Sequence, residues 1–501
     1  MKKNIVEYLD ESAKRCPNKI ALVDEEKSIT FFELYESVKK IAHAIFQKSN
    51  GLFHNKPIMV YMDKSVECII AFFGIAYSGN FYTPIDTKMP LARVEQIVDT
   101  LEPVLSISKR EKEYKGSCEN IFIEDVLEDE TIRDGIEGWK KCLDIDPLYV
   151  LFTSGSTGVP KGVVINHMGV IDYIEWLTDK FRFDETIVLG NQAPFYFDNS
   201  IFDIYLMLKN GATMVIIPEK MFAFTNLLID FLNEHAVNTI FWVPSALCSV
   251  ANTEIIHTKR LDSIRNVLFC GEVMPNKQLN IWRKEYPHLL YANLYGPTEI
   301  TDVCSYYIVD RDFADDESLP IGKACENTEI LILNDTNKAA QVGEVGELCV
   351  RGRCLSMGYY NNSEKSDNVF VQNPLNSAYR DYIYRTGDLV KLNENEEIIY
   401  LGRKDFQIKH QGHRIELGEI EAVASSMDDV ETSCVVYDEI NKKIVLFICS
   451  KKVINEKDIY KALKNRLPKY MLPASIFQID AMPLNLNGKI DRIQLKEKIK
   501  K

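Results

Sequence analysis

The chain has 501 residues, of which 46% are hydrophobic and 26% are charged, as is typical of a soluble globular protein with roughly two to four domains. Asp and Glu outnumber Lys and Arg by 73 to 59, and the resulting net charge of −14 argues against binding to nucleic acid or to an anionic membrane surface. The twelve cysteines form no C-x-x-C pair and no cluster with histidine along the sequence, which argues against a zinc site.

The N-terminus, MKKNIVEYLDESAKR, is basic for two residues and then acidic, unlike a signal peptide. The most apolar helical run, Cys68–Tyr77, has about half of the length that a membrane span needs. Scattered cysteines without a secretion signal are typical of a reducing compartment. We therefore expect a cytoplasmic protein that does not insert into a membrane.

Two short runs near the N-terminus, Ile20–Val23 and Ser28–Thr30, predict a hairpin. Thr30 and Glu33 then have the spacing of a capping box, in which each side chain accepts a hydrogen bond from the other residue's backbone. Apolar residues recur behind this box at helical spacing, at Leu34, Val38, Ile41 and Ile45. The pattern predicts a helix over about 31–47.

Short apolar runs continue along the chain, among them TMVIIP, NTIFWVP, NVLFCG and NLYGP. They alternate with amphipathic stretches of ten or more residues. This alternation predicts layered α/β structure with largely buried sheets.

The C-terminal part of the chain has a different pattern. A helix is predicted to begin near Glu416, a hairpin to join Thr432–Tyr437 to Ile444–Cys449, and a further helix to cover Asp458–Leu467. These elements make a compact α+β unit of roughly a hundred residues. No Pro-rich linker precedes them, so the junction is expected to be short and near Arg403–Asp405.

The loop Thr153–Gly162, TSGSTGVPKG, is the most informative segment, and it follows an apolar run, Leu148–Phe152, that predicts a buried strand. Glycines and hydroxyl residues alternate in it, so that backbone N–H groups lie beside hydroxyl donors, as suits a phosphate. The spacing from Gly155 to Lys161 is not that of a Walker A loop. From these residues alone, the segment is either a phosphate loop or a flexible surface turn.

The full string LFTSGSTGVPKGVV resembles the phosphate loop of the adenylate-forming superfamily, which includes acyl-CoA synthetases, firefly luciferase and the adenylation domains of peptide synthetases. Four further strings resemble the remaining signatures of those adenylation domains, in the same order: NLYGPTEITDV, YRTGDLV, GRKDFQIKHQGHRIELGEIE and LNLNGKIDR. The resemblance covers nearly the whole chain. It implies a large multi-layer α/β region over residues 1–403 and a small mobile α+β domain over 404–501.

The resemblance also implies positions that bind ATP. Tyr295 would pack on adenine, and Asp388 would accept the ribose hydroxyls with Arg403 nearby. Thr298 would contact phosphate, and Glu299 would bind Mg²⁺, because a carboxylate suits a hard cation that bridges phosphates. The other implied contacts are Thr153, Ser154, Gly155, Ser156, Thr157, Gly158, Lys161, Gly271 and Glu272. Without the resemblance, Glu299 and Asp388 would be assigned to solvated turns.

The resemblance implies that two residues take part in a movement of the small C-terminal domain. Lys489 would bridge the substrate carboxylate and the charge that develops at the α-phosphate, a task for a movable positive charge. Most lysines after a turn such as Asn487-Gly488 are solvated instead. Asp405 would be the hinge about which the small domain rotates between two half-reactions, although by itself it would be an ordinary loop residue.

Asp198 lies within the aromatic run FYFDNS. A buried carboxylate needs a cationic partner, and the resemblance implies that Asp198 binds the α-amino group of an amino acid, a group that fatty and aryl acids lack. The other implied positions of the substrate pocket are Asn199, Phe202, Ser245, Leu268, Cys270, Leu294, Asp302 and Val303.

The string FCGEV around Cys270 resembles the D-alanine:carrier-protein ligases, although a buried structural role is the commoner one for a free thiol. Asn199 and Asp302 are polar departures from that pattern. The Asp302 carboxylate either pairs with a hydroxyl, amide or amino group on the substrate's side chain or points into solvent. Alanine is therefore our first expectation for the substrate, and a polar amino acid such as serine is the second.

The sequence thus predicts a D-alanine ligase-like enzyme that uses ATP and Mg²⁺ to convert an amino acid into aminoacyl-AMP and pyrophosphate. Transfer is expected to the phosphopantetheine thiol of a separate carrier protein, because the chain ends shortly after Lys489 without a carrier module. Two alternatives are a ligase that uses free coenzyme A and a catalytically dead nucleotide-binding scaffold. Asp198 argues against the first. The second is opposed by four intact residues, Thr298, Glu299, Asp388 and Lys489.

Overall fold

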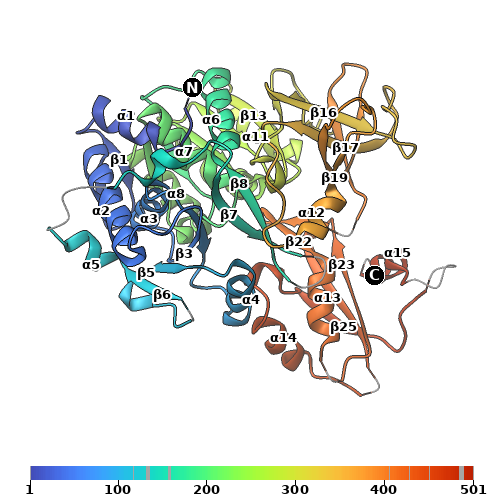
Figure 1. Ribbon diagram of the computed structural model, residues 1–501. Coiled ribbons are helices and arrows are strands. Elements are labelled where there is room, and N and C mark those ends of the chain that lie inside the picture. The colour runs from blue at the N-terminus through green and yellow to red at the C-terminus, as the bar shows by residue number, and fades with distance from the viewer. Residues whose placement is uncertain are drawn as a thin grey trace. The chain divides into compact units, whose positions relative to one another are not determined.

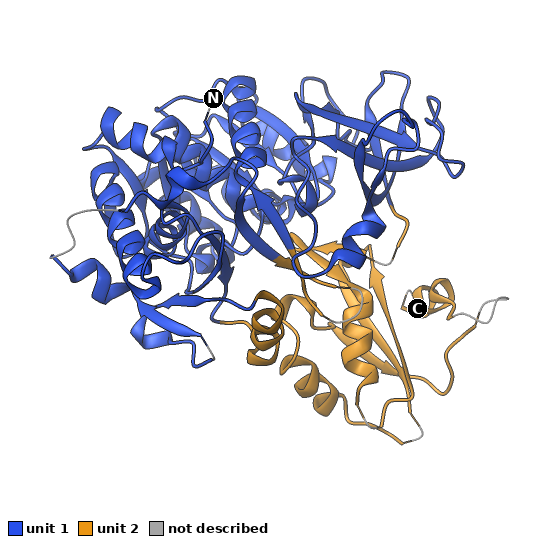
Figure 2. Ribbon diagram, viewed as in Figure 1, with its two compact units in different colours: residues 1–87, 102–151, 163–402 blue, residues 88–101, 152–162, 403–501 orange. Residues whose placement is uncertain are grey.

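The fold is seen in a computed structural model (Figure 1). It describes residues 2–116, 118–130, 136–155, 159–405, 407–427, 429–450, 452–484 and 490–499. The chain forms two compact units, which have different colours in Figure 2. Unit 1 comprises residues 1–87, 102–151 and 163–402, and unit 2 comprises residues 88–101, 152–162 and 403–501.

Unit 1 contains a nine-stranded sheet, within the described residues, in the order β15-β14-β13-β12-β11-β9-β10-β1-β2. The strands from β13 to β1 run parallel, and the strands at the two edges pair antiparallel with their neighbours. Most residues of the central strands are buried, which confirms the prediction of a buried sheet. The bounds are β1 Ile20–Val23, β2 Ser28–Thr30, β9 Val188–Asn191, β10 Thr213–Ile216, β11 Thr239–Trp242, β12 Asn266–Phe269, β13 Leu290–Tyr295, β14 Ser305–Ile308 and β15 Lys323–Ala324.

A second sheet has the order β6-β5-β3-β4-β7-β8, and its neighbours from β6 to β7 are parallel. Strand β7 is the predicted buried strand before the loop at Thr153, and its residues Leu148–Leu151 are buried. The bounds are β3 Pro57–Tyr61, β4 Phe81–Ile85, β5 Leu105–Ser108, β6 Glu119–Phe122, β7 Pro147–Thr153 and β8 Lys161–Asn166.

Two of the helices in unit 1 show how the sequence fixes local structure. The predicted helix is α2, Phe31–Ser49, and its capping box is present, since the Glu33 N–H donates to Thr30 Oγ1 at 3.2 Å and the Thr30 N–H to Glu33 Oε2 at 2.7 Å. The apolar run forms α3, Val66–Tyr77, which is buried on all sides and lies beside α2 in Figure 1. A Cβ on Gly74 would lie 2.5 Å from Ile41 Cβ, so glycine allows this close helix contact.

No helix in the described part of the chain combines the length and the apolar character that a membrane crossing requires. The other helices of the two sheet regions are α1 Glu7–Arg15, α5 Ile123–Glu128, α6 His167–Phe181, α7 Asn199–Asn210, α8 Thr225–Glu234, α9 Pro244–Ala251, α10 Ile255–Thr258 and α11 Asn276–Glu285. Short 3₁₀ helices lie at η1 Arg110–Lys112, η2 Gly138–Lys141, η3 Glu219–Ala223 and η4 Thr298–Ile300.

The C-terminal part of unit 1 is a smaller antiparallel sheet in the order β16-β17-β19-β18, with β20 also paired to β19. Its buried side chains Leu348, Val350 and Tyr384 share an apolar cluster with Tyr295, at the end of β13, and Ile300, in η4. The bounds are β16 Thr328–Leu333, β17 Gly346–Gly352, α12 Ser363–Val369, β18 Phe370–Gln372, β19 Tyr382–Leu392 and β20 Ile398–Arg403.

Unit 2 contains the predicted C-terminal α+β elements. The predicted helices and hairpin are present as α13, α14 and the antiparallel pair β23–β24, and β25 adds to β24 in parallel. Ile415, Ile420 and Leu446 belong to its apolar core. The bounds are α4 Leu91–Leu101, β21 Gln407–His410, β22 His413–Glu416, α13 Leu417–Ser425, β23 Thr432–Asp438, β24 Lys443–Cys449, α14 Glu456–Lys464, η5 Lys469–Met471, β25 Ser475–Gln478 and α15 Arg492–Ile499.

The predicted fold class is confirmed: a large α/β N-terminal region is followed by a small α+β C-terminal part. The domain boundary between residues 403 and 404 stays a prediction. Unit 2 contains the segments 88–101 and 152–162 in addition to the C-terminal residues, so the compact unit is not a single continuous stretch of chain.

Candidate active site

The loop after β7 belongs to unit 2, and its residues Gly155 and Val159 approach each other closely. A Cβ on Gly155 would lie 2.0 Å from the carbonyl oxygen of Val159, so no larger residue fits there. The Ser154 hydroxyl donates to the Arg414 carbonyl at 2.7 Å and accepts the Glu416 N–H at 3.2 Å. Ser154 is therefore bonded to the backbone of β22. Lys161 begins β8 and is half-buried.

Part of the predicted phosphate-binding set lies outside the described residues, namely Ser156, Thr157 and Gly158. Lys489, the predicted catalytic lysine, also lies outside them. Among the described residues, Thr153 Oγ1 is buried and has no hydrogen-bond partner. An orphaned buried hydroxyl at the start of such a loop is available to an incoming acceptor.

In unit 1, Tyr295 and Asp388 are brought together from β13 and β19. The Tyr295 hydroxyl donates to Asp388 Oδ2, and the Asp388 N–H donates to Thr386 Oγ1 at 3.0 Å. Both side chains are buried, so the interpretation of Asp388 as a solvated turn residue is wrong. Burial and the neighbouring Asp388 carboxylate raise the pKa of the Tyr295 hydroxyl well above its usual value, which keeps it a neutral donor.

Thr298 and Glu299 form the short 3₁₀ helix η4, and Glu299 is fully buried. The Tyr359 hydroxyl donates to Glu299 Oε1 at 2.7 Å, and the Ser356 N–H donates to the Glu299 carbonyl at 2.9 Å. The alternative of an exposed turn glutamate is therefore wrong. The Glu299 carboxylate and the Thr298 hydroxyl are hard oxygen donors, the type that Mg²⁺ prefers.

Asp198 is joined to Thr298, a hundred positions further along the chain. The Thr298 hydroxyl donates to Asp198 Oδ2 at 2.5 Å, and the Asn199 N–H donates to Asp198 Oδ1 at 3.0 Å. Asp198 is the N-cap residue of α7, where the helix dipole stabilises negative charge. The carboxylate is half-buried and is held next to the Thr of the phosphate motif.

Asn199 follows Asp198 and presents an unused donor. Its Nδ2 is buried and has no hydrogen-bond partner in the described part of the chain. A Cβ on Gly271 would lie 3.8 Å from this nitrogen, which places Asn199 beside the loop after β12. In that loop, Glu272 Oε2 accepts the Ser245 N–H at 2.8 Å. Three of the predicted regions, at α7, α9 and β12, are thereby brought together.

The apolar pocket positions share one buried cluster. Its members include five predicted residues, Phe202, Leu268, Cys270, Leu294 and Val303. The Phe202 ring stacks on Phe241 with centroids 4.4 Å apart. Phe202 and Leu268 have no solvent-exposed surface. They therefore belong to the packed core of unit 1.

Asp302 has a partner within the protein that the sequence did not reveal. The Tyr173 hydroxyl, from α6, donates to Asp302 Oδ2 at 2.7 Å, and Asp302 is only 1% exposed. The alternative of a carboxylate that points into solvent is therefore wrong. Burial and Asp302 raise the pKa of the Tyr173 hydroxyl well above its usual value, so the tyrosine stays protonated and donates.

Arg403 and Asp405 form a bidentate ion pair in unit 2, with the guanidinium Nε and Nη2 each 2.7 Å from a carboxylate oxygen. Burial opposes the charge on Asp405, but the Arg403 guanidinium outweighs it and lowers the pKa of the carboxyl. The predicted ribose-binding arginine is thus bonded to the predicted hinge residue.

Sequence reasoning missed Tyr173 and Tyr359, which anchor Asp302 and Glu299. It also missed Arg93, whose guanidinium forms a buried ion pair with Glu419 within unit 2. No local pattern marks these residues, because each partner lies far away in the sequence.

Two largely parallel sheets in the large N-terminal region and a small α+β C-terminal part are the architecture expected of the adenylate-forming class. The AMP-binding enzyme family matches residues 9–360, and the AMP-binding enzyme C-terminal domain matches residues 419–489. The chain therefore belongs to the AMP-binding enzyme family, within the adenylate-forming superfamily.

Two curated relatives illustrate the range of the family. Gramicidin S synthase 1 of Brevibacillus brevis is 29% identical over 99% of this chain, and D-alanine--D-alanyl carrier protein ligase of Bacillus licheniformis is 31% identical over 99% of both chains. The chain spans 44% of the length of gramicidin S synthase 1 and 19% of the length of a mycosubtilin synthase protein of Bacillus subtilis, to which it is 34% identical.

A solved structure confirms the fold. Holo-PA1221, described as an NRPS protein containing adenylation and PCP domains bound to a vinylsulfonamide inhibitor, superposes with a TM-score of 0.87. The match covers 99% of this chain and 84% of the other at 22% identity.

Proposed function

We propose that the protein activates an amino acid with ATP, as aminoacyl-AMP, and passes it to the phosphopantetheine thiol of a separate carrier protein. The hydrogen bond from Thr298 to Asp198 carries the proposal. This bond joins Asp198, the proposed ammonium-binding residue, to Thr298 of the proposed phosphate motif, and both residues lie in unit 1. The ligase from Bacillus licheniformis, whose full length matches this chain, supports the same activity.

In the first half-reaction, an oxygen of the amino acid's carboxylate attacks the α-phosphorus of ATP, a new O–P bond forms, and the bond to pyrophosphate breaks. Asp198 would hold the ammonium group, and the buried cluster around Phe202 would receive the side chain. Asp388 would accept ribose hydroxyls, and Tyr295 would lie against adenine.

The phosphates would be bound by the loop from Thr153 to Gly158 and by Lys161, Gly271 and Glu272. Mg²⁺ held by Glu299 would neutralise phosphate charge. Lys489 would supply a positive charge where the pentavalent transition state gathers negative charge. In the second half-reaction, the thiol gives up its proton to solvent and its sulfur attacks the acyl carbon. The bond from this carbon to the phosphate oxygen breaks, a thioester forms, and AMP leaves.

We propose a small amino acid as the substrate, with alanine first and serine second. The Tyr173 hydroxyl already donates to Oδ2 of Asp302, so this carboxylate has a hydrogen-bond donor within the protein, which favours alanine. The free Nδ2 of Asn199 favours a substrate with an acceptor and keeps serine as the second choice. If Asp302→Val retains alanine activation, Asp302 is not a substrate contact. A strong preference for a large aromatic or long aliphatic amino acid would contradict this pocket assignment.

Intact-mass measurement of carrier proteins tests the proposed transfer. The full chain is incubated with ATP, Mg²⁺ and alanine together with holo carrier proteins, with the corresponding apo carriers, or with free coenzyme A. We expect an aminoacyl mass increase on at least one holo carrier and none on its apo form. Faster acylation of free coenzyme A than of every holo carrier would favour the coenzyme A ligase instead.

A further inference from the structure

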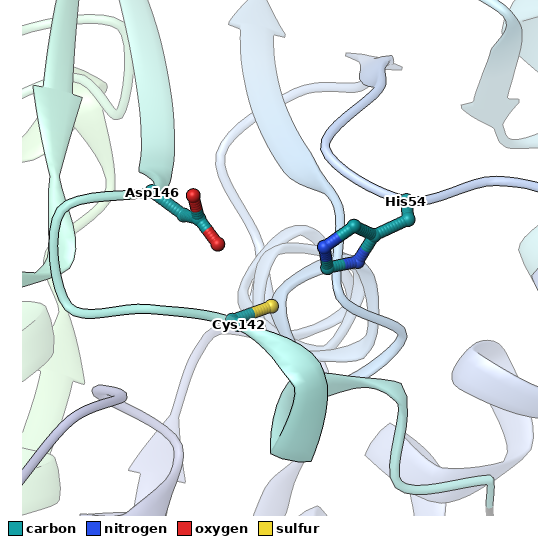
Figure 3. Close-up of side chains that lie close together, drawn as sticks. All are labelled: His54, Cys142 and Asp146. Carbon is teal, nitrogen blue, oxygen red and sulfur yellow. The ribbon is translucent and has the colours of Figure 1, made fainter.

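Three side chains with metal-binding atoms converge in unit 1, away from the residues discussed above. They are His54, Cys142 and Asp146, whose ligand atoms all lie within 4.8 Å of one another. Figure 3 shows the three side chains pointing toward one another. Cys142 is buried, Asp146 is half-buried and His54 is exposed. His54 and Cys142 are far apart in the sequence, so a search for local spacing could not find this group.

Hydrogen bonds hold the backbone around these three side chains. Asp146 Oδ2 accepts the Leu143 N–H at 2.8 Å, which holds the carboxylate on its turn. The Cys142 N–H donates to the Trp139 carbonyl at 2.9 Å, at the end of η2. The Asn55 N–H donates to the Gly79 carbonyl at 2.9 Å, and this bond fixes the loop that carries His54. The three side chains are therefore held on defined turns.

A Cys–His nucleophile is the main alternative for these residues. Such a pair requires the histidine within hydrogen-bond reach of the sulfur. Among the described contacts, no hydrogen bond joins Cys142 to His54. Burial, followed by the Asp146 carboxylate, raises the pKa of the Cys142 thiol to about 12, so an unassisted thiolate is disfavoured. The arrangement does not fit a nucleophile.

We propose that His54, Cys142 and Asp146 bind one divalent transition-metal ion of the zinc type, with solvent as the fourth ligand. A set of one nitrogen, one sulfur and one oxygen suits Zn²⁺, whereas Mg²⁺ and Ca²⁺ prefer oxygen alone. Ligand atoms around tetrahedral zinc lie roughly 3.3–3.8 Å apart, given zinc–ligand distances of about 2.0–2.3 Å. The required contraction from at most 4.8 Å is small, and the exposed His54 side chain is free to make it.

The position of the site indicates a structural role. His54 precedes β3, Asp146 precedes β7, and these two strands flank β4 in the second sheet. A bound ion would therefore link two strand-entry loops across β4. The loop at Thr153 follows the other end of β7, about 20 Å away along a strand of this length. We thus expect the metal to raise thermal stability without changing the rate of adenylate formation.

Binding must release the Cys142 proton, because the thiolate is the ligand. The Cys142 S–H bond breaks, the sulfur–metal bond forms, and the proton passes to solvent. The apparent affinity is therefore expected to rise with pH.

Competition with a chromophoric chelator, using the metal-free full chain and Zn²⁺, tests the proposal. We expect one Zn²⁺ ion to bind tightly per chain. His54→Ala and Cys142→Ser should each weaken the affinity for Zn²⁺ more than about 100-fold, since loss of an outer-shell partner alone costs about 10–100-fold. Cys118→Ser and His288→Ala are matched controls and should bind as the wild type does. His54 is exposed, so its variant is not expected to disturb folding.

The absorption spectrum of bound Co²⁺ gives a second test, because a change in folding alone would not produce a sulfur-to-cobalt band. Co²⁺ should give a sulfur-to-cobalt charge-transfer band in the wild type, and this band should be absent in Cys142→Ser. Zn²⁺ should also raise the Tm of the wild type and leave that of His54→Ala unchanged. Zinc binding that both substitutions leave unaltered, or the absence of a Cys142-dependent cobalt band, would overturn the proposal.

Discussion

The Asp198 carboxylate is held by two neutral donors, the Asn199 N–H and the Thr298 hydroxyl. In the proposed function, the ammonium group of the substrate forms an ion pair with this carboxylate. Loss of one partner from a buried ion pair typically costs about 3–5 kcal/mol. Asp198→Ala should therefore lower amino-acid-dependent ATP–pyrophosphate exchange by more than about a hundredfold, and it should tolerate the des-amino acid better.

Asp179→Ala, at an exposed position of α6, is the control for Asp198→Ala and should behave as the wild type does. Unchanged amino-acid activity in Asp198→Ala would contradict the ammonium-binding role and favour an acyl-CoA synthetase.

His167 gives a prediction for the pH dependence of stability. Burial lowers the pKa of its imidazole to about 3, and Nδ1 accepts the Ile5 N–H at 3.3 Å. The unfolded chain binds a proton below pH 6.5, whereas the folded ring does not. This contribution is therefore complete above pH 6.5 and is lost as the pH falls toward 3. From pH 7.5 to 5, the loss from His167 is about 2 kcal/mol.

Thermal unfolding of His167→Gln across this pH range checks the point. The variant should be less stable at pH 7.5 but should lose less Tm on acidification than the wild type. His288→Gln, which alters an exposed ring, should keep the wild-type slope. Equal slopes for all three proteins would show that His167 does not control the acid response.

At the scale of elements, α4 and α13 are joined in unit 2 by Arg93 and Glu419, whose side chains are 3% and 1% exposed. Removal of one partner leaves a buried charge and typically costs about 3–5 kcal/mol. Arg93→Ala should therefore lower the unfolding free energy of unit 2 by that amount, as measured by hydrogen exchange in α4 and α13.

The double variant Arg93→Met/Glu419→Leu separates the ion pair from simple packing. Replacing a buried ion pair by apolar residues of similar volume is often neutral, so most of the lost protection should return. If the losses in unfolding free energy from the Arg93 and Glu419 single substitutions simply add in the double variant, the two residues are not coupled.

The elements that the sequence predicted are those whose signals are local. The Thr30–Glu33 capping box, the run that became α3 and the β23–β24 hairpin each depend on neighbouring residues. The environment of the site depends on residues that are distant in the sequence. Tyr173 and Tyr359 reach Asp302 and Glu299 from other elements, and no spacing rule connects them. Motif resemblance proposed the site residues, but it could not show which of them are buried.

At the scale of the whole molecule, the two proposed half-reactions would make different demands on the small C-terminal part. If Lys489 serves only adenylation, Lys489→Ala should slow adenylate formation by on the order of 10²–10³ while thioester formation from supplied aminoacyl-AMP continues. Rapid-quench measurement of each half-reaction distinguishes these effects. Equal losses in both steps would contradict the separate use of Lys489.

Asp405→Pro should have the opposite effect. Proline fixes φ near −65°, and the substitution also removes the carboxylate that pairs with Arg403. Adenylation should continue and carrier loading should fail. Asp405→Asn is the control, since it keeps the backbone free. Normal carrier loading by Asp405→Pro would place the hinge elsewhere.

The central claim is that this member of the AMP-binding enzyme family activates an amino acid. ATP–pyrophosphate exchange with the full chain, over a panel of L- and D-amino acids and their des-amino analogues, tests it most directly. We predict Mg²⁺-dependent exchange with at least one small amino acid and little exchange with its des-amino analogue. Exchange only with acids that lack an amino group, or no exchange with any acid, would contradict the claim.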